Sequence, residues 1–574
     1  MNLFFYKRFC QTPNICSGLV SGFLFLIVLF FAREVFSQPI PTPAEPERLD
    51  SQFEPPEQPL ATEEPVVPES RDALPSSELG LIKFVLKGVH LKGVRTYRKR
   101  ALEQFYKPYM GKQVSLLKIY EIAGKITAKY RNDGYILSRA VVPKQKIRHG
   151  IVRILVVEGF IDEIEIKGNN WDFTDHIKNY ADRILQSRPL QSATLERYLL
   201  FIDDLPGVKV QSILTPSKYT FGASKLTLIT KHQIVDAFVS MDNRGSEYNG
   251  PMQFTMGANL NNAFGLFERT GYRFIMTLGD EELQYFSAHH DQRVGSYGTR
   301  VFLFGSFSHT NPGLELKLLE VKGDTATISG FIQQPFIRSR GMNLYGRLGM
   351  TGRDSETQIL GIVLNTDRLR VINVGFTFDW VDSFKGVNLI SFDYNQGINV
   401  FNARETGSDF LTRVDGKSEF SKVFGRFLRM QRILPRWNLL FETVWQYSFD
   451  NLLASEEFAI GGPRFGRGYD PSEFTGENGV AGKVELHYAI PVGWEYLKDF
   501  QPYGFADYGA VWNFDPEISS QPKFKEIISA GMGIRVNFTD HISGYVEAVK
   551  PLNEVVRAEG NDNIRVFFSI NARY

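Results

Sequence analysis

The sequence predicts an all-β transmembrane barrel of about 16 antiparallel strands, preceded by two small α/β domains. Three observations support this fold class. The region from Ile234 to Tyr574 shows no helical period and consists of alternating segments about ten residues long. The region before it repeats one order of strands and helices twice. The 574 residues include 50 Gly and 47 Phe, which suits many strands and tight turns.

Apolar and polar residues alternate most clearly in four segments of the C-terminal region. These segments are 372–380, 484–490, 528–538 and 564–574. Successive side chains of a strand point to opposite faces, so each strand would have one apolar face and one face carrying charge and glycine. The second face would therefore be wet, as in a barrel with an aqueous interior or in a soluble sandwich.

Three features favour a membrane barrel, at 233–574, over a soluble sandwich. The strands have the nine to eleven residues of a tilted bilayer crossing. Aromatic residues crowd the strand ends, where an interfacial girdle would lie; they are Trp380, Trp445, Tyr447, Tyr508 and Trp512. The last strand is amphipathic, with Phe568 and Tyr574 on its apolar face. We expect a barrel assembly machinery to recognise this strand by strand pairing.

Residues 1–37 have the layout of a secretory signal peptide. Lys7 and Arg8 precede an apolar run from residue 19 to 32, and Val35-Phe36-Ser37 forms a small-x-small-like cleavage site. The alternative is an uncleaved anchor helix, but the run is short for a bilayer span. Both cysteines of the chain lie in this region, so the processed protein would have no disulfide framework.

Residues 38–78 are expected to form a Pro-rich, acidic linker. The stretch from Gln38 to Pro75 has ten prolines and nine acidic residues against two basic ones, Arg48 and Arg71. Such a segment buries too little apolar surface to fold alone and should be extended and self-repelling. A short helix between Glu47 and Phe53 is the alternative for part of it.

Residues 79–158 and 159–232 each show the order β-α-α-β-β. In the first unit, strands are expected at 81–86, 136–142 and 151–157, and helices at 97–106 and from Ser115 to Tyr130. In the second, strands are expected at 160–166, 208–215 and 226–231, and helices at 173–185 and 193–200. The alternative to a tandem repeat is two unrelated α/β pieces.

Signatures of enzymes and of nucleic-acid binding are absent. The chain has no G-x-S-x-G motif, and its formal net charge of +1 gives no basic surface for nucleic acid. Residues 476–483 are spaced one residue too long for a phosphate loop. His289 to Asp291 fit a polar extracellular turn better than a metal site, and Asp379 and Asp382 fit strand-end and turn positions. We expect no catalytic residue, cofactor or metal.

Two motifs forty residues apart carry the functional prediction. The first is Arg467-Gly468-Tyr469 in a glycine-rich loop, and the second is Phe505-x-Asp507-x-Gly509 in an alternating strand. Phe505, Asp507 and Gly509 would share the lumen face of the strand. A carboxylate there needs a partner, and arginine provides a planar, bidentate and always charged one. We expect loop 461–482 to enter the lumen and Arg467 to pair with Asp507; the alternative is a solvated surface loop.

These two motifs, in this order after two β-α-α-β-β units, resemble the outer-membrane transporters of two-partner secretion. The resemblance covers the chain after the signal peptide and implies that the α/β units are periplasmic POTRA domains. It implies a pore that recognises an unfolded exoprotein, such as a large β-helical adhesin or haemolysin, and conducts it to the cell surface. Outer-membrane lipid and the barrel assembly machinery would be the other partners.

The chain departs from this family pattern at two places. Gly466 precedes Arg467, where the family usually has Val, and a Pro-rich segment stands where the family often has a plug helix. Two other functions remain open on the sequence alone. One is an insertase of the same superfamily, which usually has more POTRA units; the other is a passive porin with a periplasmic extension.

Overall fold

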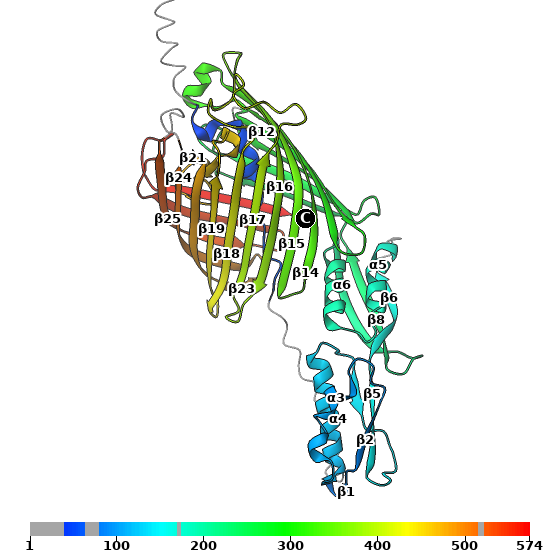
Figure 1. The fold of residues 1–574 in the computed structure, drawn as a ribbon. Helices are drawn as coiled ribbons and strands as arrows, with labels where there is room; N and C mark the ends of the chain where they lie inside the picture. The colour runs from blue at the N-terminus through cyan, green and yellow to red at the C-terminus, as the bar shows by residue number, and fades with distance from the viewer. Residues whose placement is uncertain (1–39, 63–79, 169–173, 280, 515–521) are drawn as a thin grey trace, which may run out of the picture.

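The computed structural model describes residues 40–62, 80–168, 174–279, 281–514 and 522–574. The expected signal peptide at 1–37 lies outside these residues. A large barrel carries two small α/β units at one end of its wall, the second unit next to the barrel and the first beyond it (Figure 1). Within the described part of the chain, no helix is long and apolar enough to cross a membrane.

The described residues form a closed barrel of sixteen antiparallel strands, which confirms the predicted fold class. β22 and β23 pair with the same neighbour, β24, and are consecutive parts of one wall strand. The wall consists of β9 (Val235–Asp242), β10 (Gln253–Asn261), β11 (Glu268–Thr277), β12 (Leu283–Val294), β13 (Thr299–Thr310), β14 (Lys322–Arg338), β15 (Met342–Ile359), β16 (Ile362–Val381), β17 (Val387–Gly397), β18 (Ser421–Leu434), β19 (Trp437–Ser448), β22 (Asn478–Tyr488), β23 (Ile490–Trp494), β24 (Leu497–Trp512), β25 (Phe524–Asn537), β26 (Ile542–Pro551) and β27 (Arg565–Arg573).

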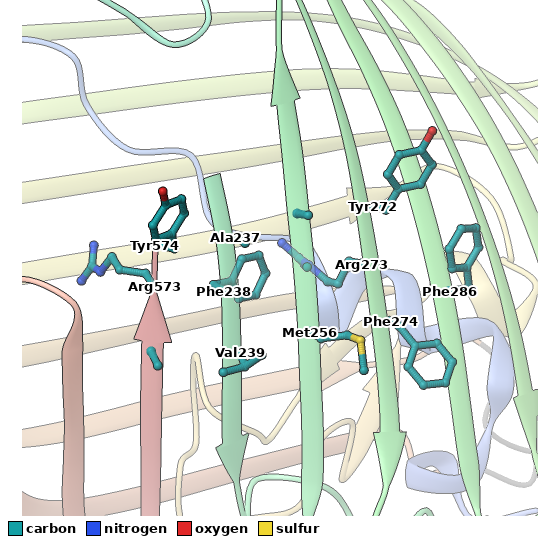
Figure 2. Close-up of a pocket in the computed structure, with 13 residues that line it drawn as sticks. Ala237, Phe238, Val239, Met256, Tyr272, Arg273, Phe274, Phe286, Arg573 and Tyr574 are labelled. Carbon is teal, nitrogen blue, oxygen red and sulfur yellow. The ribbon is translucent and has the colours of Figure 1, made fainter. Parts of the chain in front are cut away.

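The barrel closes where the last strand meets the first. β27 pairs with β9, and the backbone N–H of Tyr574 donates to the carbonyl of Ala237 at 2.8 Å. The strands beside this seam line a depression of about 600 Å³ with apolar walls that include Met256, Tyr272 and Phe286 (Figure 2). These side chains are exposed on the outer face, where Tyr574 is also exposed. The seam therefore presents an apolar surface to lipid.

The inner face of the wall is polar and largely buried. Asn343, Asp379, Glu485 and Asp507 are all almost inaccessible to solvent although each lies on a wall strand. Their immediate strand neighbours point outward and are apolar or small, as the alternation predicted. Buried polar groups need hydrogen-bond partners, so the inner face needs material inside the barrel to contact it.

The two α/β units have the same architecture. The first contains β1 (Lys83–Val85), β2 (Gly88–Lys92), α3 (Lys99–Glu103), η4 (Lys107–Tyr109), β3 (Gln113–Ser115), α4 (Leu116–Asn132), β4 (Arg139–Val141) and β5 (Ile151–Val157). The second contains β6 (Phe160–Gly168), α5 (Thr174–Leu185), α6 (Ser192–Asp203), β7 (Val208–Pro216) and β8 (Ala223–His232). The sheet orders are β2-β5-β4 and β6-β8-β7, with helices packed on one face.

Three local predictions are wrong. The strand expected at 81–86 is only the short β1, which pairs with β3, and the first strand of the main sheet, β2, begins at Gly88. The helix expected at 97–106 shrinks to α3, because Pro108 lies in a separate 3₁₀ turn, η4. The segment from His289 to Asp291 is not a turn but part of β12, with Asp291 buried.

The linker prediction is also wrong for the described residues 40–62, which lie inside the barrel (blue in Figure 1). They form η1 (Thr42–Ala44), η2 (Pro46–Arg48) and α2 (Leu49–Phe53), followed by extended chain. Ala44, Arg48 and Leu49 are buried. The acidic, Pro-rich composition prevents independent folding, but the polar lumen supplies the partners that the segment lacks by itself.

Candidate functional site

The loop that carries Arg467 is folded into the barrel. It is framed by a two-stranded hairpin of β20 (Phe458–Ile460) and β21 (Phe474–Gly476), with η6 (Ala454–Glu456) before it. Residues 478–482, expected to belong to the loop, are already part of the wall strand β22. The loop has its own apolar core, in which Phe465 and Tyr469 pack with Ile527 of the wall.

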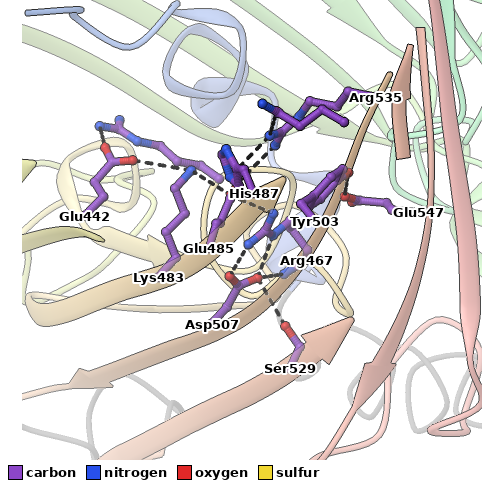
Figure 3. Close-up of polar contacts among 12 residues, drawn as sticks. Glu442, Arg467, Lys483, Glu485, His487, Tyr503, Asp507, Ser529, Arg535 and Glu547 are labelled. Carbon is purple, nitrogen blue, oxygen red and sulfur yellow. Dashed lines mark hydrogen bonds and ion pairs between the residues drawn. The ribbon is translucent and has the colours of Figure 1, made fainter. Parts of the chain in front are cut away.

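Arg467 and Asp507 form a bidentate ion pair. Nη2 of Arg467 lies 2.6 Å from Oδ1 of Asp507, and Nε lies 2.9 Å from Oδ2 (Figure 3). The backbone N–H of Arg467 also donates to Oδ2, at 3.0 Å. The side chains are 4% and 0% exposed, so neither charge is solvated in this state. One carboxylate therefore fixes both the position and the orientation of the loop tip.

A second carboxylate, Glu485 on β22, completes the surroundings of Arg467. Its Oε1 accepts from Nη1 of Arg467 at 2.8 Å, while Oε2 contacts Arg535 at 3.0 Å and His487 at 2.7 Å (Figure 3). Lys483 lies 3.8 Å from Glu485. Sequence reasoning missed Glu485, because it occupies an ordinary polar position of an alternating strand and only the loop's fold brings Arg467 to it.

Gly468 and Tyr469 fix the loop tip against the neighbouring strands. A Cβ on Gly468 would lie 3.0 Å from the backbone nitrogen of Pro551. The Tyr469 hydroxyl donates to Asn553 and to the carbonyl of Ile528, at 3.0 and 3.2 Å. The small residue thus permits close approach, and the tyrosine hydroxyl satisfies groups at the strand ends.

Phe505 and Gly509 shape the wall under the loop. The Arg467 guanidinium lies 3.4 Å from the centroid of the Phe505 ring, a cation–π contact on the side chain next along the lumen face from Asp507. A Cβ on Gly509 would lie 2.9 Å from the Ile460 side chain. In the wall motif, Phe505 thus provides an aromatic ring for Arg467, Asp507 provides its counter-charge, and Gly509 leaves room for the side chain of Ile460.

The N-terminal segment is anchored beside this loop by two charges. Nη2 of Arg48 lies 3.0 Å from Glu457, which also pairs with Arg413 of the β17–β18 connection. Asp50 accepts hydrogen bonds from three wall hydroxyls on three adjacent strands; they belong to Tyr285, Ser306 and Thr327. Arg48 stood out in the sequence only as one of two bases in an acidic stretch, and no pattern indicated its partner.

The rest of the segment runs extended along the lumen. Arg426 donates to the carbonyl of Glu57 at 2.6 Å, and Thr377 donates to the Glu57 side chain at 3.1 Å. The backbone N–H of Ala61 donates to Asp379 at 2.5 Å. The lumen therefore holds two segments at once, the loop and residues 40–62.

Comparisons with known proteins show which family has this fold and these motifs. Residues 222–536 match the family model described as haemolysin secretion/activation protein ShlB/FhaC/HecB, and residues 84–159 match a ShlB-type POTRA domain. The chain belongs to this family. The match covers more than half of the chain and favours the secretion branch over an insertase or a passive porin.

Relatives and solved structures agree with the assignment. The chain is 23% identical over 460 residues to the heme/hemopexin transporter protein HuxB of Haemophilus influenzae, covering 79% of this chain and 80% of that one. It is 23% identical to the hemolysin transporter protein HpmB of Proteus mirabilis, covering 69% and 70%. CdiB from Escherichia coli superposes with a TM-score of 0.70 at 19% identity, covering 98% and 99%, and at this identity shows the fold.

As a member of this family, the protein is a two-partner secretion transporter. Its barrel lies in the bacterial outer membrane, its POTRA domains lie in the periplasm, and it moves an exoprotein to the cell surface. The end of the barrel beside the POTRA domains is therefore the periplasmic end, and the end that contains α2 is the extracellular end (Figure 1).

The second POTRA domain is docked on the periplasmic turns of the barrel. Arg338, at the end of β14, holds Asp204 bidentately at 2.7 and 2.9 Å. The same arginine donates to Asn343 at 3.0 Å, and Asn343 donates to Asp379 at 2.9 Å. Asp379 in turn receives the N–H of Ala61. A continuous hydrogen-bond chain, partly buried at Asp204 and buried from Arg338 onward, thus connects the POTRA domain to the segment in the lumen.

Proposed function

We propose that this transporter exports a large β-helical exoprotein of the adhesin or haemolysin type, and that the observed arrangement is its closed resting state. The observation that carries the proposal is the buried Arg467–Asp507 pair, which holds loop 461–482 across the lumen. Relatives described as a heme/hemopexin transporter and a hemolysin transporter support the class of cargo. The proposal assigns this chain no catalytic step.

Capture of the cargo begins in the periplasm. Each POTRA sheet has edge strands, β2 and β4 in the first domain and β6 and β7 in the second. An extended exoprotein segment can add to such an edge through main-chain hydrogen bonds. The loop and residues 40–62 then leave the conduction path, the cargo passes in extended form, and its folding outside supplies the driving force.

The last strand serves assembly of the transporter itself. Phe568 lies on the outward face of β27, and Tyr574 ends the chain on that face. The barrel assembly machinery reads this strand by pairing before the seam to β9 forms, and outer-membrane lipid then covers the apolar side chains.

Export of a defined exoprotein tests the proposal. The cargo to use is a β-helical exoprotein encoded beside this chain, co-expressed with it in a host that has an outer membrane. The full chain should release or display the exoprotein, whereas a chain lacking residues 79–231, the POTRA domains, should insert in the membrane and export none. A wild-type chain that exports no such exoprotein, or equal display with the truncated chain, would refute the proposal.

A further inference from the structure

Residues 53–62, the part of the N-terminal segment that runs toward the periplasmic end of the lumen, are hydrogen-bonded to the wall mainly through their backbone groups. The carbonyl of Glu57 accepts from Arg426, the N–H of Ala61 donates to Asp379, and the N–H of Thr62 donates to the carbonyl of Arg340 at 2.8 Å. Farther toward the extracellular end, Arg273 donates to the carbonyl of Phe53 at 2.7 Å. Four wall groups thus bind backbone groups of residues 53–62, and the Phe53 ring in addition packs against Tyr285, with 4.9 Å between the ring centroids.

Apart from the Glu54 and Glu57 carboxylates, which interact electrostatically with Arg347, the side chains of residues 54–62 contribute little to binding. Residues 54–58 are exposed although they lie inside the barrel, and Leu60 is 48% exposed. The contact between Thr377 and the Glu57 carboxylate is the side-chain hydrogen bond that the described residues 54–62 show. Pro55, Pro56 and Pro59 fix φ and keep the stretch extended without wall contacts.

The wall groups lie in register across neighbouring strands. Thr377 on β16, Ser391 on β17 and Arg426 on β18 are direct cross-strand partners. Asp379 lies one lumen-facing position closer to the periplasm on β16, and Arg340 lies in the β14–β15 turn at the periplasmic mouth. They offer, in order toward the extracellular end, a backbone carbonyl and a carboxylate that accept from N–H groups, and then a guanidinium that donates to a carbonyl. The groups that they bind are the N–H and C=O groups of the backbone, which do not depend on the side chains.

We propose that Arg340, Asp379 and Arg426 form a sequence-independent track for extended polypeptide, and that residues 54–62 occupy it as an internal mimic of the cargo. The inference rests on the proposed function, since the partner is the exoprotein in transit. A conduit for a long chain must tolerate every side chain, and contacts to N–H and C=O groups do so. Conduction also requires weak binding, which the exposed side chains of residues 54–58 provide.

Peptide block of an opened pore tests the track. The full-length chain carries Arg48→Ala and Asp50→Ala, which remove the two charged anchors, and its current is recorded in a planar bilayer. The first probe is the peptide of residues 53–62, added from the periplasmic side. The second probe keeps the prolines and has serine at all remaining positions. The third keeps the native side chains but is N-methylated at the positions of Ala61 and Thr62.

The first two peptides should block with affinities within about threefold of each other, and the N-methylated peptide should block about tenfold more weakly. Arg426→Gln should weaken the first two peptides alike, by about tenfold, whereas Arg426→Lys, which keeps a donor, should weaken them less. Block that requires the native side chains, or that survives N-methylation unchanged, would overturn the track. If the opened variant gives no folded barrel, Arg48→Gln with Asp50→Asn replaces it.

Because loop 461–482 also crosses the lumen, a pore that stays closed in both variants receives Arg467→Ala in addition, and the same peptide comparison then decides. Export of the exoprotein by the wild-type chain, measured in parallel, separates the two proposals. Failed export with normal peptide block would refute the proposed function but not the track. Normal export without peptide block would refute the track alone.

Discussion

At the level of single residues, Arg467 is held by contacts to two carboxylates and an aromatic ring. Its three donating side-chain nitrogens and its backbone N–H all bind carboxylates, and its plane covers Phe505. Without Arg467, Asp507 would keep, among the described residues, only the Ser529 hydroxyl at 3.3 Å, whereas Glu485 would keep Arg535 and His487. Loss of the arginine therefore strands a buried charge, whereas loss of Asp507 leaves Arg467 paired with Glu485.

Gly466→Ala should loosen the loop tip. Gly466 has φ of +79°, and an added Cβ would lie 2.4 Å from Cδ1 of Ile527. The backbone strain alone costs about 1–2 kcal/mol, and the overlap adds to it. Protease cleavage within residues 461–473 should increase relative to wild type. Gly504→Ala is the control, because its Cβ meets nothing closer than 4.0 Å; equal protection of both variants would contradict the prediction.

At the level of residues, the sequence predicted the ion pair for which each of the two motifs contains one partner. The loop motif and the wall motif named Arg467 and Asp507, and the structure joins them. The same reasoning could not find Glu485, Arg426 or Asp50, because their partners lie in segments whose path depends on the whole fold. At position 466, where the family usually has Val, glycine suits the left-handed backbone, which β-branched residues rarely adopt.

At the level of elements, the first POTRA domain should lose stability in acid through Glu158. Burial alone would raise the pKa of this carboxyl, but the N–H groups of Thr96 and Arg95 and the Tyr130 hydroxyl hold the pKa below its usual range. The contribution is fully present above the unfolded pKa of about 4.3 and is lost as pH falls through the lower folded value.

The expected loss is about 1 kcal/mol, because the carboxylate is only partly buried. Hydroxyl-radical footprinting of Tyr130 during urea unfolding of the full chain should show a lower midpoint at pH 3 than at pH 7. Glu158→Gln should reduce this difference. A midpoint that depends on pH equally in wild type and variant would show that Glu158 is not responsible.

Docking of the second POTRA domain should depend on Arg338. Replacing it by Gln removes the bidentate pair with Asp204, and we expect docking to weaken by about 2 kcal/mol. Spin labels at Ala193 and Lys385 should then show a broader distance distribution. Arg340→Gln is the matched control, because its side chain is exposed and the contacts described for it use the backbone. An unchanged distribution in Arg338→Gln would exclude this role.

Elements with a strong period were predicted well, and elements fixed by tertiary contacts were not. Helix α4 follows from the spacing of Ile119, Ile122 and Ile126, all of which are buried. The short strands β1 and β2 were misassigned, because three- and five-residue strands carry too little pattern. Residues 40–62 were assigned to a linker, because no local signal shows that a lumen elsewhere in the chain supplies their partners.

At the level of the whole molecule, the barrel depends on its last strand. Removing residues 564–574 would leave one edge of β26 and one edge of β9 unpaired, and an open edge in lipid is costly. We expect no heat-modifiable barrel in the outer membrane for this truncation. Phe568→Leu keeps the pairing and the apolar face and should assemble normally. Wild-type amounts of the truncated barrel would contradict the closure that the structure shows.

The central claim, that the Arg467–Asp507 pair holds the loop across the lumen, is tested most directly by a double-mutant cycle. Arg467→Ala, Asp507→Ala and the double variant are compared for protease accessibility of residues 461–473 from the outside, with barrel content as control. Losing one partner of a buried pair costs about 3–5 kcal/mol. The account predicts that both single variants expose the loop, Arg467→Ala more strongly, and that the double variant is no worse than Arg467→Ala. Strictly additive effects, or a loop equally accessible in wild type and all variants, would contradict it.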